Sequence, residues 1–288
     1  MTAYHRPSTL VDALRLRQAH PDHIVLAGGT DLLVSANRRP EPPGIIDVFG
    51  LVPLVTIVAD RDGSVMIGAA TTYAAILASD LVRRELPGLA AAAREVGALQ
   101  IQARGTLGGN IATSSPVGDT LPVLLALDAV VEVASAARGD RAISYDQFIT
   151  GYRTTALAPD ELIVRVRFPP RPPDARHYWR KMGTRRAQSI SKVMVAACAQ
   201  VDGGVVRHVR LGLGAVADRP VRARAAEAAI LGAAPGPAAA MAARAALAGE
   251  IRPIDDVRST AAYRLAAAKN AVARFVESLA EPAPVPTS

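Results

Sequence analysis

The stretch "IVLAGGTDLLV", from Ile24 to Val34, and the stretch "RGTLGGNIATSSPVGD", from Arg104 to Asp119, share one composition. Each surrounds a Gly-Gly pair with small polar residues, and the first begins with an apolar run that predicts a short buried strand. Adjacent glycines let backbone N–H groups converge on an anion because no Cβ atom blocks the approach, and a following helix end adds positive partial charge. Thr30, Thr106 and Asn110 add side-chain donors. A diphosphate is large enough to need two such loops.

The same stretches are also compatible with ordinary turns. A Gly-Gly pair after a strand often marks a plain turn, and Asp119 is a candidate N-cap for a helix that begins near Leu121. The common nucleotide motifs do not decide the question, because the sequence has no G-x-G-x-x-G after a strand and no G-x-x-x-x-G-K-[ST]. Residue chemistry alone leaves the plain turns and a shared phosphate site equally open.

The length and composition indicate a globular protein. The chain has 288 residues, half of them hydrophobic, which can bury a substantial core in one or two domains. No apolar run approaches the roughly 20 residues that span a bilayer, and the first residues lack a signal-peptide pattern, so we expect no membrane span and a cytoplasmic location. The single cysteine, Cys198, lies in an apolar run and is expected in the core. One thiol cannot hold an iron–sulfur cluster.

The charge of the chain does not indicate nucleic-acid binding. The formal net charge is +7, but the arginines are scattered and only 4% of the residues are aromatic. A nucleic-acid surface would need a dense basic stripe with interleaved aromatic side chains. We therefore expect no nucleic-acid partner.

The pattern of apolar residues predicts mixed helices and strands. "HRPSTLVDALRLRQAH" predicts a helix capped at Ser8 or Thr9, with Asp12 three residues after Thr9. Further helices are expected at "TTYAAILAS" and "ELPGLAAAAREVG", and a helix or helical turn at "TDLLVSANRR". A hairpin is expected in "LVTIVADRDGSVMIGAA". Strands are expected at "HIVLAGG", "GIIDVFG", "DAVVEVAS", "RAISYDQF" and "DELIVRVRFP".

The proline-rich segment "PPRPPD", from Pro169 to Asp174, predicts a domain boundary because it cannot continue a central strand. Beyond it, "SKVMVAACAQVDGGVVRHVRLGLGAV" predicts a second hairpin, followed by alanine-rich helices at 221–231, 238–248 and 259–279. Strands before helices are typical of an α+β domain with an antiparallel sheet. We expect one domain over 1–172, a second over 173–280, and a disordered tail over 281–288.

Three motifs together resemble a known family. "LAGGTDLLV", "VGALQIQARGTLGGNIATSSPVGDTLPVLLALDA" and "RKMGTRRAQSISKVMVAA" are similar, in order and spacing, to the FAD-binding medium subunit of the molybdenum hydroxylases, the xanthine dehydrogenase and carbon monoxide dehydrogenase group. The resemblance extends to "AAYRLAAAKNAVARF" and so covers nearly the whole chain. It implies an α+β protein: a two-part FAD-binding domain of the vanillyl-alcohol-oxidase (PCMH) type, then a C-terminal domain with a small antiparallel sheet and helices.

The resemblance also implies which residues bind non-covalent FAD. The first diphosphate loop corresponds to Ala27, Gly28, Gly29, Thr30, Asp31 and Leu32, and the second to Thr106, Leu107, Gly108, Gly109 and Asn110. Asp119 matches an acidic residue that accepts hydrogen bonds from cofactor hydroxyls, Ile163 an apolar residue near the flavin, and Lys181 a lysine at the ring system. A lysine there favours the negative charge of a reduced flavin. No residue is expected to act as a catalytic acid or base, or to bind a metal ion.

The implied function is electron transfer within a larger oxidoreductase. Substrate would be hydroxylated at a molybdenum cofactor on a large partner subunit. Electrons would pass through [2Fe–2S] clusters on a small partner to FAD on this chain, and then to NAD⁺ or another acceptor. The resemblance implies a dimer of heterotrimers, and it identifies neither the substrate nor the acceptor.

Two other functions remain as alternatives. One is a stand-alone FAD-dependent reductase of the same superfamily, similar to UDP-N-acetylenolpyruvoylglucosamine reductase. That enzyme should have a glycine- and tyrosine-containing stretch and a serine proton donor after the second loop, which "NIATSSPVGDT" does not resemble. The other is a flavin-free scaffold subunit, against which the intact loop residues argue.

Overall fold

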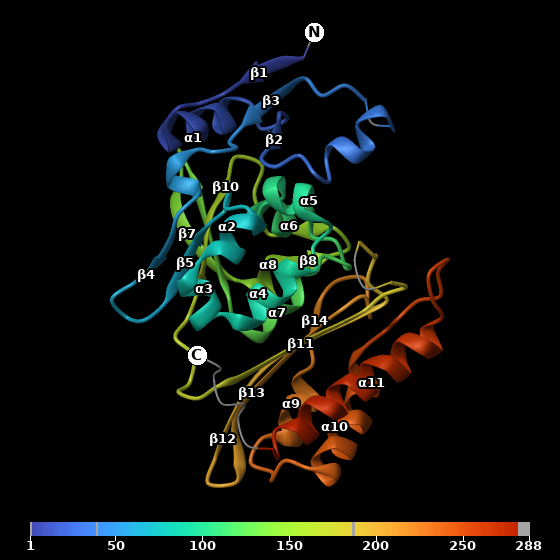
Figure 1. Ribbon diagram of the computed structural model, residues 1–288. Coiled ribbons are helices and arrows are strands. Elements are labelled where there is room, and N and C mark those ends of the chain that lie inside the picture. Colours follow the sequence, from blue (N-terminus) through green and yellow to red (C-terminus); the bar gives the residue numbers. More distant parts are fainter. Residues whose placement is uncertain (1, 39, 186–187, 282–288) are drawn as a thin grey trace. The chain divides into compact units, whose positions relative to one another are not determined.

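The computed structural model describes residues 2–38, 40–185 and 188–281. The chain divides into two compact units (Figure 1). Unit 1 comprises Met1–Ser115 and Ala129–Pro170, and unit 2 comprises Pro116–Asp128 and Arg171–Ser288. The segment predicted to be a disordered tail lies, beyond Glu281, outside the described residues. Within the described ranges, no helix is long and apolar enough to cross a membrane.

The first part of unit 1 is a small parallel sheet covered by one helix (dark blue in Figure 1). Its strands lie in the order β1 (Ala3–His5), β3 (Gly44–Asp47), β2 (Ile24–Leu26). Helix α1 (Leu10–Ala19) begins at Thr9, whose side chain accepts a hydrogen bond from the Asp12 N–H, as the sequence predicts. Ala13 of α1 is fully buried in one apolar cluster with Ile46 of β3. The short 3-10 helix η1 (Leu33–Arg38) follows β2 and is the predicted helical turn.

The second part of unit 1 is an antiparallel five-stranded sheet. The strand order is β4 (Ile57–Ala59), β5 (Val65–Gly68), β10 (Leu162–Phe168), β6 (Val130–Ser135), β7 (Gly139–Ser144). A small two-stranded sheet is formed by β8 (Ile149–Gly151) and β9 (Thr154–Thr155). The helical segments of this part are α2 (Tyr73–Ala78), α3 (Asp80–Glu85), α4 (Pro87–Arg94), α5 (Leu99–Arg104), α6 (Leu107–Thr113), α8 (Tyr145–Phe148) and the 3-10 turn η2 (Val52–Leu54). The predicted β4–β5 hairpin and the two-part organisation of this domain are confirmed.

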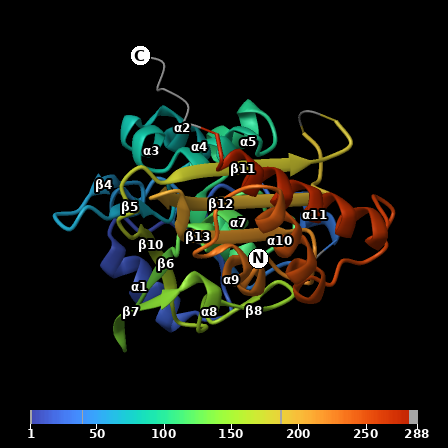
Figure 2. The same ribbon diagram turned by 90° about the horizontal axis from the view of Figure 1, so that it is seen from below.

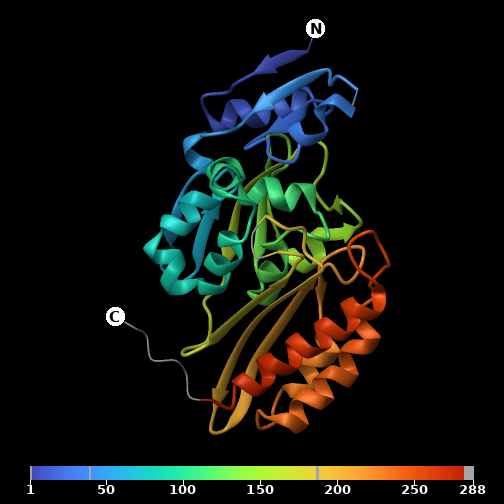
Figure 3. The same cartoon turned by 45° about the vertical axis from the view of Figure 1, so that its right-hand side comes forward.

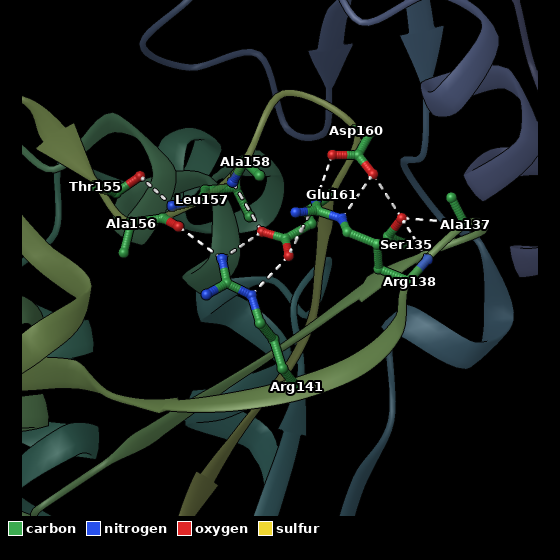
Figure 4. A network of polar contacts seen from close by, with 10 residues as sticks. All are labelled: Ser135, Ala137, Arg138, Arg141, Thr155, Ala156, Leu157, Ala158, Asp160 and Glu161. Carbon is green, nitrogen blue, oxygen red and sulfur yellow. Dashed lines mark hydrogen bonds and ion pairs between the residues drawn. The ribbon is translucent and has the colours of Figure 1, made fainter.

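A buried carboxylate fixes the turn that leads into the central strand β10 (Figure 4). Glu161 is 2% exposed and accepts two hydrogen bonds of 2.7 Å from the guanidinium of Arg141 and one of 2.8 Å from the Ala158 N–H. The neighbouring Asp160 accepts hydrogen bonds from Ser135 and Arg138. Arg141 hydrogen bonding lowers the pKa of Glu161, so this carboxyl group stays ionised at neutral pH.

Unit 2 is an antiparallel sheet with helices on both faces. The strand order is β11 (Arg176–Met182), β12 (Val193–Asp202), β13 (Val205–Gly214), β14 (Val221–Arg222). Helices α9 (Arg224–Ile230), α10 (Pro237–Glu250) and α11 (Ala261–Ser278) pack on one face (Figures 2 and 3). Leu211 and Leu213 of β13 belong to the core that these helices cover. The alternate residue Gly212 faces the backbone of α7 (Leu121–Ala126), because its ideal Cβ would lie 2.0 Å from the Pro122 carbonyl oxygen.

Several local expectations differ from the structure. Strands β1 and β11 were not anticipated, the segment at 221–222 is a strand rather than the start of a helix, and Tyr145–Phe148 is a short helix. Strand β2 is only partly buried, since Val25 is 36% exposed. The β12–β13 hairpin and the burial of Cys198 are confirmed.

Candidate functional site

The two glycine loops touch each other within unit 1. Gly28 follows β2, and an ideal Cβ atom on it would lie 1.8 Å from the carbonyl oxygen of Arg104, the residue before Gly105 and Thr106. Only a residue without a side chain allows this backbone-to-backbone approach. The ideal Cβ of Gly105 would in turn lie 3.3 Å from the hydroxyl oxygen of Thr30. Two stretches separated by more than seventy residues therefore form one structural feature.

The first loop presents backbone donors that have no carbonyl partner in the part of the chain that the structure describes. Gly29 has a φ of +76°, in the left-handed region, and its carbonyl accepts a hydrogen bond of 2.9 Å from the Leu33 N–H. Among the described residues, no backbone carbonyl accepts a hydrogen bond from the N–H groups of Gly28, Gly29 or Thr30. Gly29 and Thr30 are partly exposed. Successive amides of this kind, with one left-handed residue, suit an anion.

The amides at the start of the second loop are already occupied. The Leu107 N–H donates to the Thr71 carbonyl at 3.1 Å, the Gly108 N–H to the Ala69 carbonyl at 2.8 Å, and the Gly109 N–H to the Thr106 hydroxyl at 3.1 Å. The expectation that these glycine amides converge on an anion does not match this hydrogen bonding. The second loop can offer two side chains to a ligand: the hydroxyl of Thr106, which is the N-cap of α6, and the side chain of Asn110, which lies within α6.

The two glycines of the second loop have different structural roles. An ideal Cβ on Gly108 would lie 2.6 Å from both the Cβ and the carbonyl oxygen of Ala69, so Gly108 allows α6 to pack on the chain that follows β5. An ideal Cβ on Gly109 would meet only the Thr106 hydroxyl, at 2.8 Å. Leu107 is fully buried. Sequence reasoning gave these residues one shared role, because side-chain-free positions look alike until their neighbours are known.

The remaining predicted residues of unit 1 lie in different surroundings. Asp31 is exposed and lies 3.8 Å from the guanidinium of Arg153. Ala27 and Leu32 are partly buried at the two ends of the first loop. Ile163 is 7% exposed in β10, next to a register shift between Ile163 and Arg165.

In unit 2, the predicted residues Asp119 and Lys181 form an ion pair. The Lys181 Nζ atom lies 2.9 Å from one oxygen of the Asp119 carboxylate, and the Ser191 hydroxyl donates to the other oxygen at 2.8 Å. The lysine side chain is 5% exposed and the aspartate side chain 12%. The alternative role of Asp119 as a helix N-cap is wrong, because α7 begins after Thr120. Ser191 was not predicted, and its place in "AQSISK" gave no local signal of a carboxylate 72 residues away.

The described residues form no candidate metal centre. No group of three or more His, Cys, Asp or Glu residues in that part of the chain is placed to hold a metal ion. Burial raises the pKa of the Cys198 thiol to about 11, so the thiolate nucleophile is not formed at neutral pH. The arrangement of the first loop can bind an anionic ligand.

Two family models match successive parts of the chain. The FAD binding domain in molybdopterin dehydrogenase matches residues 1–171, and the CO dehydrogenase flavoprotein C-terminal domain matches residues 177–279.

Individual relatives agree with the family models. The xanthine dehydrogenase FAD-binding subunit of Escherichia coli O157:H7 is 35% identical over 229 residues, which cover 78% of this chain and 77% of the relative. The nicotine 6-hydroxylase medium subunit of Paenarthrobacter nicotinovorans is 34% identical over 264 residues, 91% of each chain. Among solved structures, a chain of carbon monoxide dehydrogenase from Hydrogenophaga pseudoflava matches with a TM-score of 0.90 and 32% identity, over 95% of each chain.

Proposed function

Because this chain belongs to the FAD-binding medium subunits of the molybdenum hydroxylase family, we propose that it transfers electrons from partner subunits to a separate acceptor. It is the flavoprotein component of an oxidoreductase, and its cofactor is FAD. When bound, FAD would supply the redox chemistry. The chain's own residues bind and orient that group.

The contact between the two loops is the observation that carries the proposal. It places the N–H groups of Gly28, Gly29 and Thr30, which donate to no carbonyl of the described residues, next to the chain that leads into the second loop. A dinucleotide diphosphate carries several acceptor oxygens, so it matches a site built from backbone donors and hydroxyl groups. The residues present therefore fit FAD. We propose that the first loop binds the diphosphate through its backbone, and that Thr106 and Asn110 bind it through their side chains.

The roles of the other predicted residues remain proposals drawn from the resemblance. Asp119 and Lys181 would contact the hydroxyl groups and the ring system of FAD, and Ile163 would pack near the ring. The Ser191–Asp119–Lys181 hydrogen bonds orient the carboxylate and the ammonium group before any ligand binds. A preorganised ammonium group favours negative charge on the ligand without a further ordering cost.

The partners follow from the names of the relatives. Several relatives are medium subunits or medium chains of dehydrogenases and hydroxylases, which is consistent with larger and smaller subunits beside them. We propose a large subunit with the molybdenum cofactor and a small subunit with [2Fe–2S] clusters, assembled as a dimer of heterotrimers. We propose NAD⁺ or another acceptor for the electrons, and a cytoplasmic location for the complex.

Anaerobic reduction of the flavin tests this function. The full chain, loaded with FAD, is mixed with the large and small subunits and the substrate of the large subunit, and the flavin absorption band is followed. We expect the band to bleach only when the small subunit is present, and to recover on addition of NAD⁺. Bleaching by NADPH with the chain alone would instead support the stand-alone reductase. A chain that takes up no FAD would support the scaffold.

A further inference from the structure

We propose that Arg104 binds the diphosphate of the cofactor through its guanidinium group. The inference rests on the proposed function, in which FAD is held by the two loops. Arg104 is the last residue of α5 and was not among the residues that the sequence predicted. Three observations place it at the site: its backbone contact with Gly28, its stacking on an aromatic ring, and the absence of a partner for its charge among residues 2–38, 40–185 and 188–281.

The fold places the side chain of Arg104 beside the first loop. Strands β2 and β3 are parallel, and Leu26 pairs with Asp47 at their carboxyl ends. Gly28 and Phe49 each lie two residues beyond this pair, so both are at the same edge of the sheet. The Cζ atom of Arg104 lies 3.8 Å from the centroid of the Phe49 ring, while the Arg104 carbonyl contacts Gly28.

Stacking fixes the guanidinium group without using its hydrogen-bond donors. The ring of Phe49 contacts the flat face of the group, and the N–H donors point outward from the edge. Among the described residues, no hydrogen bond or ion pair involves the Arg104 side chain, which is exposed.

The carboxylate two residues before Phe49 and the carboxylate of the first loop have other partners. Asp47 accepts a hydrogen bond of 2.5 Å from the Tyr4 hydroxyl, and Asp31 lies 3.8 Å from Arg153. An oriented guanidinium group therefore lies beside the amides of the first loop, and neither has a hydrogen-bond partner within the described ranges. A planar fork of donors suits two phosphate oxygens at once.

A titration with two flavins separates charge recognition from general packing. The purified full chain, freed of flavin, is titrated with FAD and with riboflavin, which has the same ring system but no phosphate. Arg104→Gln should raise the Kd for FAD at least about tenfold, because a hydrogen bond to a charged group is lost. It should leave riboflavin binding unchanged and should reduce the salt dependence of FAD binding.

Matched variants keep the result interpretable. Arg104→Lys retains the positive charge and should recover part of the affinity, and Phe49→Leu should weaken FAD binding by releasing the guanidinium group. Arg61→Gln removes another exposed arginine of unit 1, in the β4–β5 turn, and should change nothing. Thermal unfolding of each variant reports whether it is folded.

The outcomes distinguish this inference from the function on which it rests. A wild-type chain that binds no FAD would overturn both. If the wild type binds FAD and Arg104→Gln binds it with the same Kd and the same salt dependence, the function stands and the role of Arg104 is rejected. Equal losses of FAD and riboflavin binding in Arg104→Gln would likewise reject it.

Discussion

Replacement of Gly28 by alanine should separate the two loops and abolish FAD retention. The new Cβ atom would start 1.8 Å from the Arg104 carbonyl oxygen, where real Cβ contacts essentially never fall below 3.0 Å, so the two backbones must move apart by about 1.2 Å. A hydrogen bond of about 2.9 Å would then exceed 4 Å and be lost. Each hydrogen bond to a charged group contributes about 1.5–3 kcal/mol, so the loss of two weakens binding by about 3–6 kcal/mol, or two to four orders of magnitude in Kd.

Flavin fluorescence quenching measures this Kd, and thermal unfolding of the same samples shows that the variant is folded. Gly249→Ala is the matched control, because its ideal Cβ, near the end of α10, meets no atom within 4 Å. It should bind FAD as the wild type does. The reasoning would be refuted if folded Gly28→Ala bound FAD with the wild-type Kd.

Three further predictions concern ionisable groups. His177 has buried ring nitrogens without hydrogen-bond partners among the described residues, and burial lowers its pKa to about 4, so the folded state disfavours the charged form. Stability should therefore fall by about 3 kcal/mol as the pH drops from the unfolded pKa near 6.5 to about 4, and denaturant unfolding of His177→Leu should lack this step. Glu161→Gln should lower the unfolding free energy by about 3 kcal/mol at pH 7, since Arg141 loses a buried carboxylate. The pKa of Glu161 is lowered in the folded state, so the wild-type advantage should be present above about pH 4.5 and disappear in acid; equal denaturation midpoints at pH 7 would contradict this. Asp119→Asn should lower the free energy of unfolding, because Lys181 then lacks its carboxylate partner. The double variant Asp119→Asn with Lys181→Met should be more stable than Asp119→Asn alone in the same denaturant assay. If the effects of the two substitutions on the unfolding free energy were additive, the result would argue against the ion pair.

Features with local causes were predictable from the sequence. The Thr9 cap of α1 needs only Asp12 three residues later, and the hairpin turns at Asp60–Gly63 and Asp202–Gly204 need only their own turn residues. The fold class followed from these signals and from the family resemblance, because the second part of the chain has its strands before its helices.

Features that depend on distant neighbours were not predictable. Strand β11 reads "RHYWRKM", whose mixture of basic and aromatic residues lacks a simple alternation, and only its pairing with β12 makes it a strand. The hydrogen bond from Ser191 to Asp119 spans 72 residues. The segment Pro116–Asp128 belongs to unit 2 although its neighbours on both sides belong to unit 1, and no local signal marks this exchange.

The second loop shows the same limit at the site itself. Its Gly-Gly pair predicted donors for an anion, but the Gly108 N–H donates to the Ala69 carbonyl and the Gly109 N–H donates to the Thr106 hydroxyl. A glycine pattern indicates which positions lack a side chain, but it does not indicate whether a ligand or the protein's own backbone occupies the space. Gly28 is the clearer case, since its close approach to Arg104 joins the two loops.

A crystal structure of the full chain with bound FAD tests the central claim most directly. The diphosphate oxygens should lie about 2.7–3.2 Å from the amides of Gly28–Thr30 and from the side chains of Thr106 and Asn110. A diphosphate bound away from the joined loops, with those amides still lacking a partner, would contradict the account.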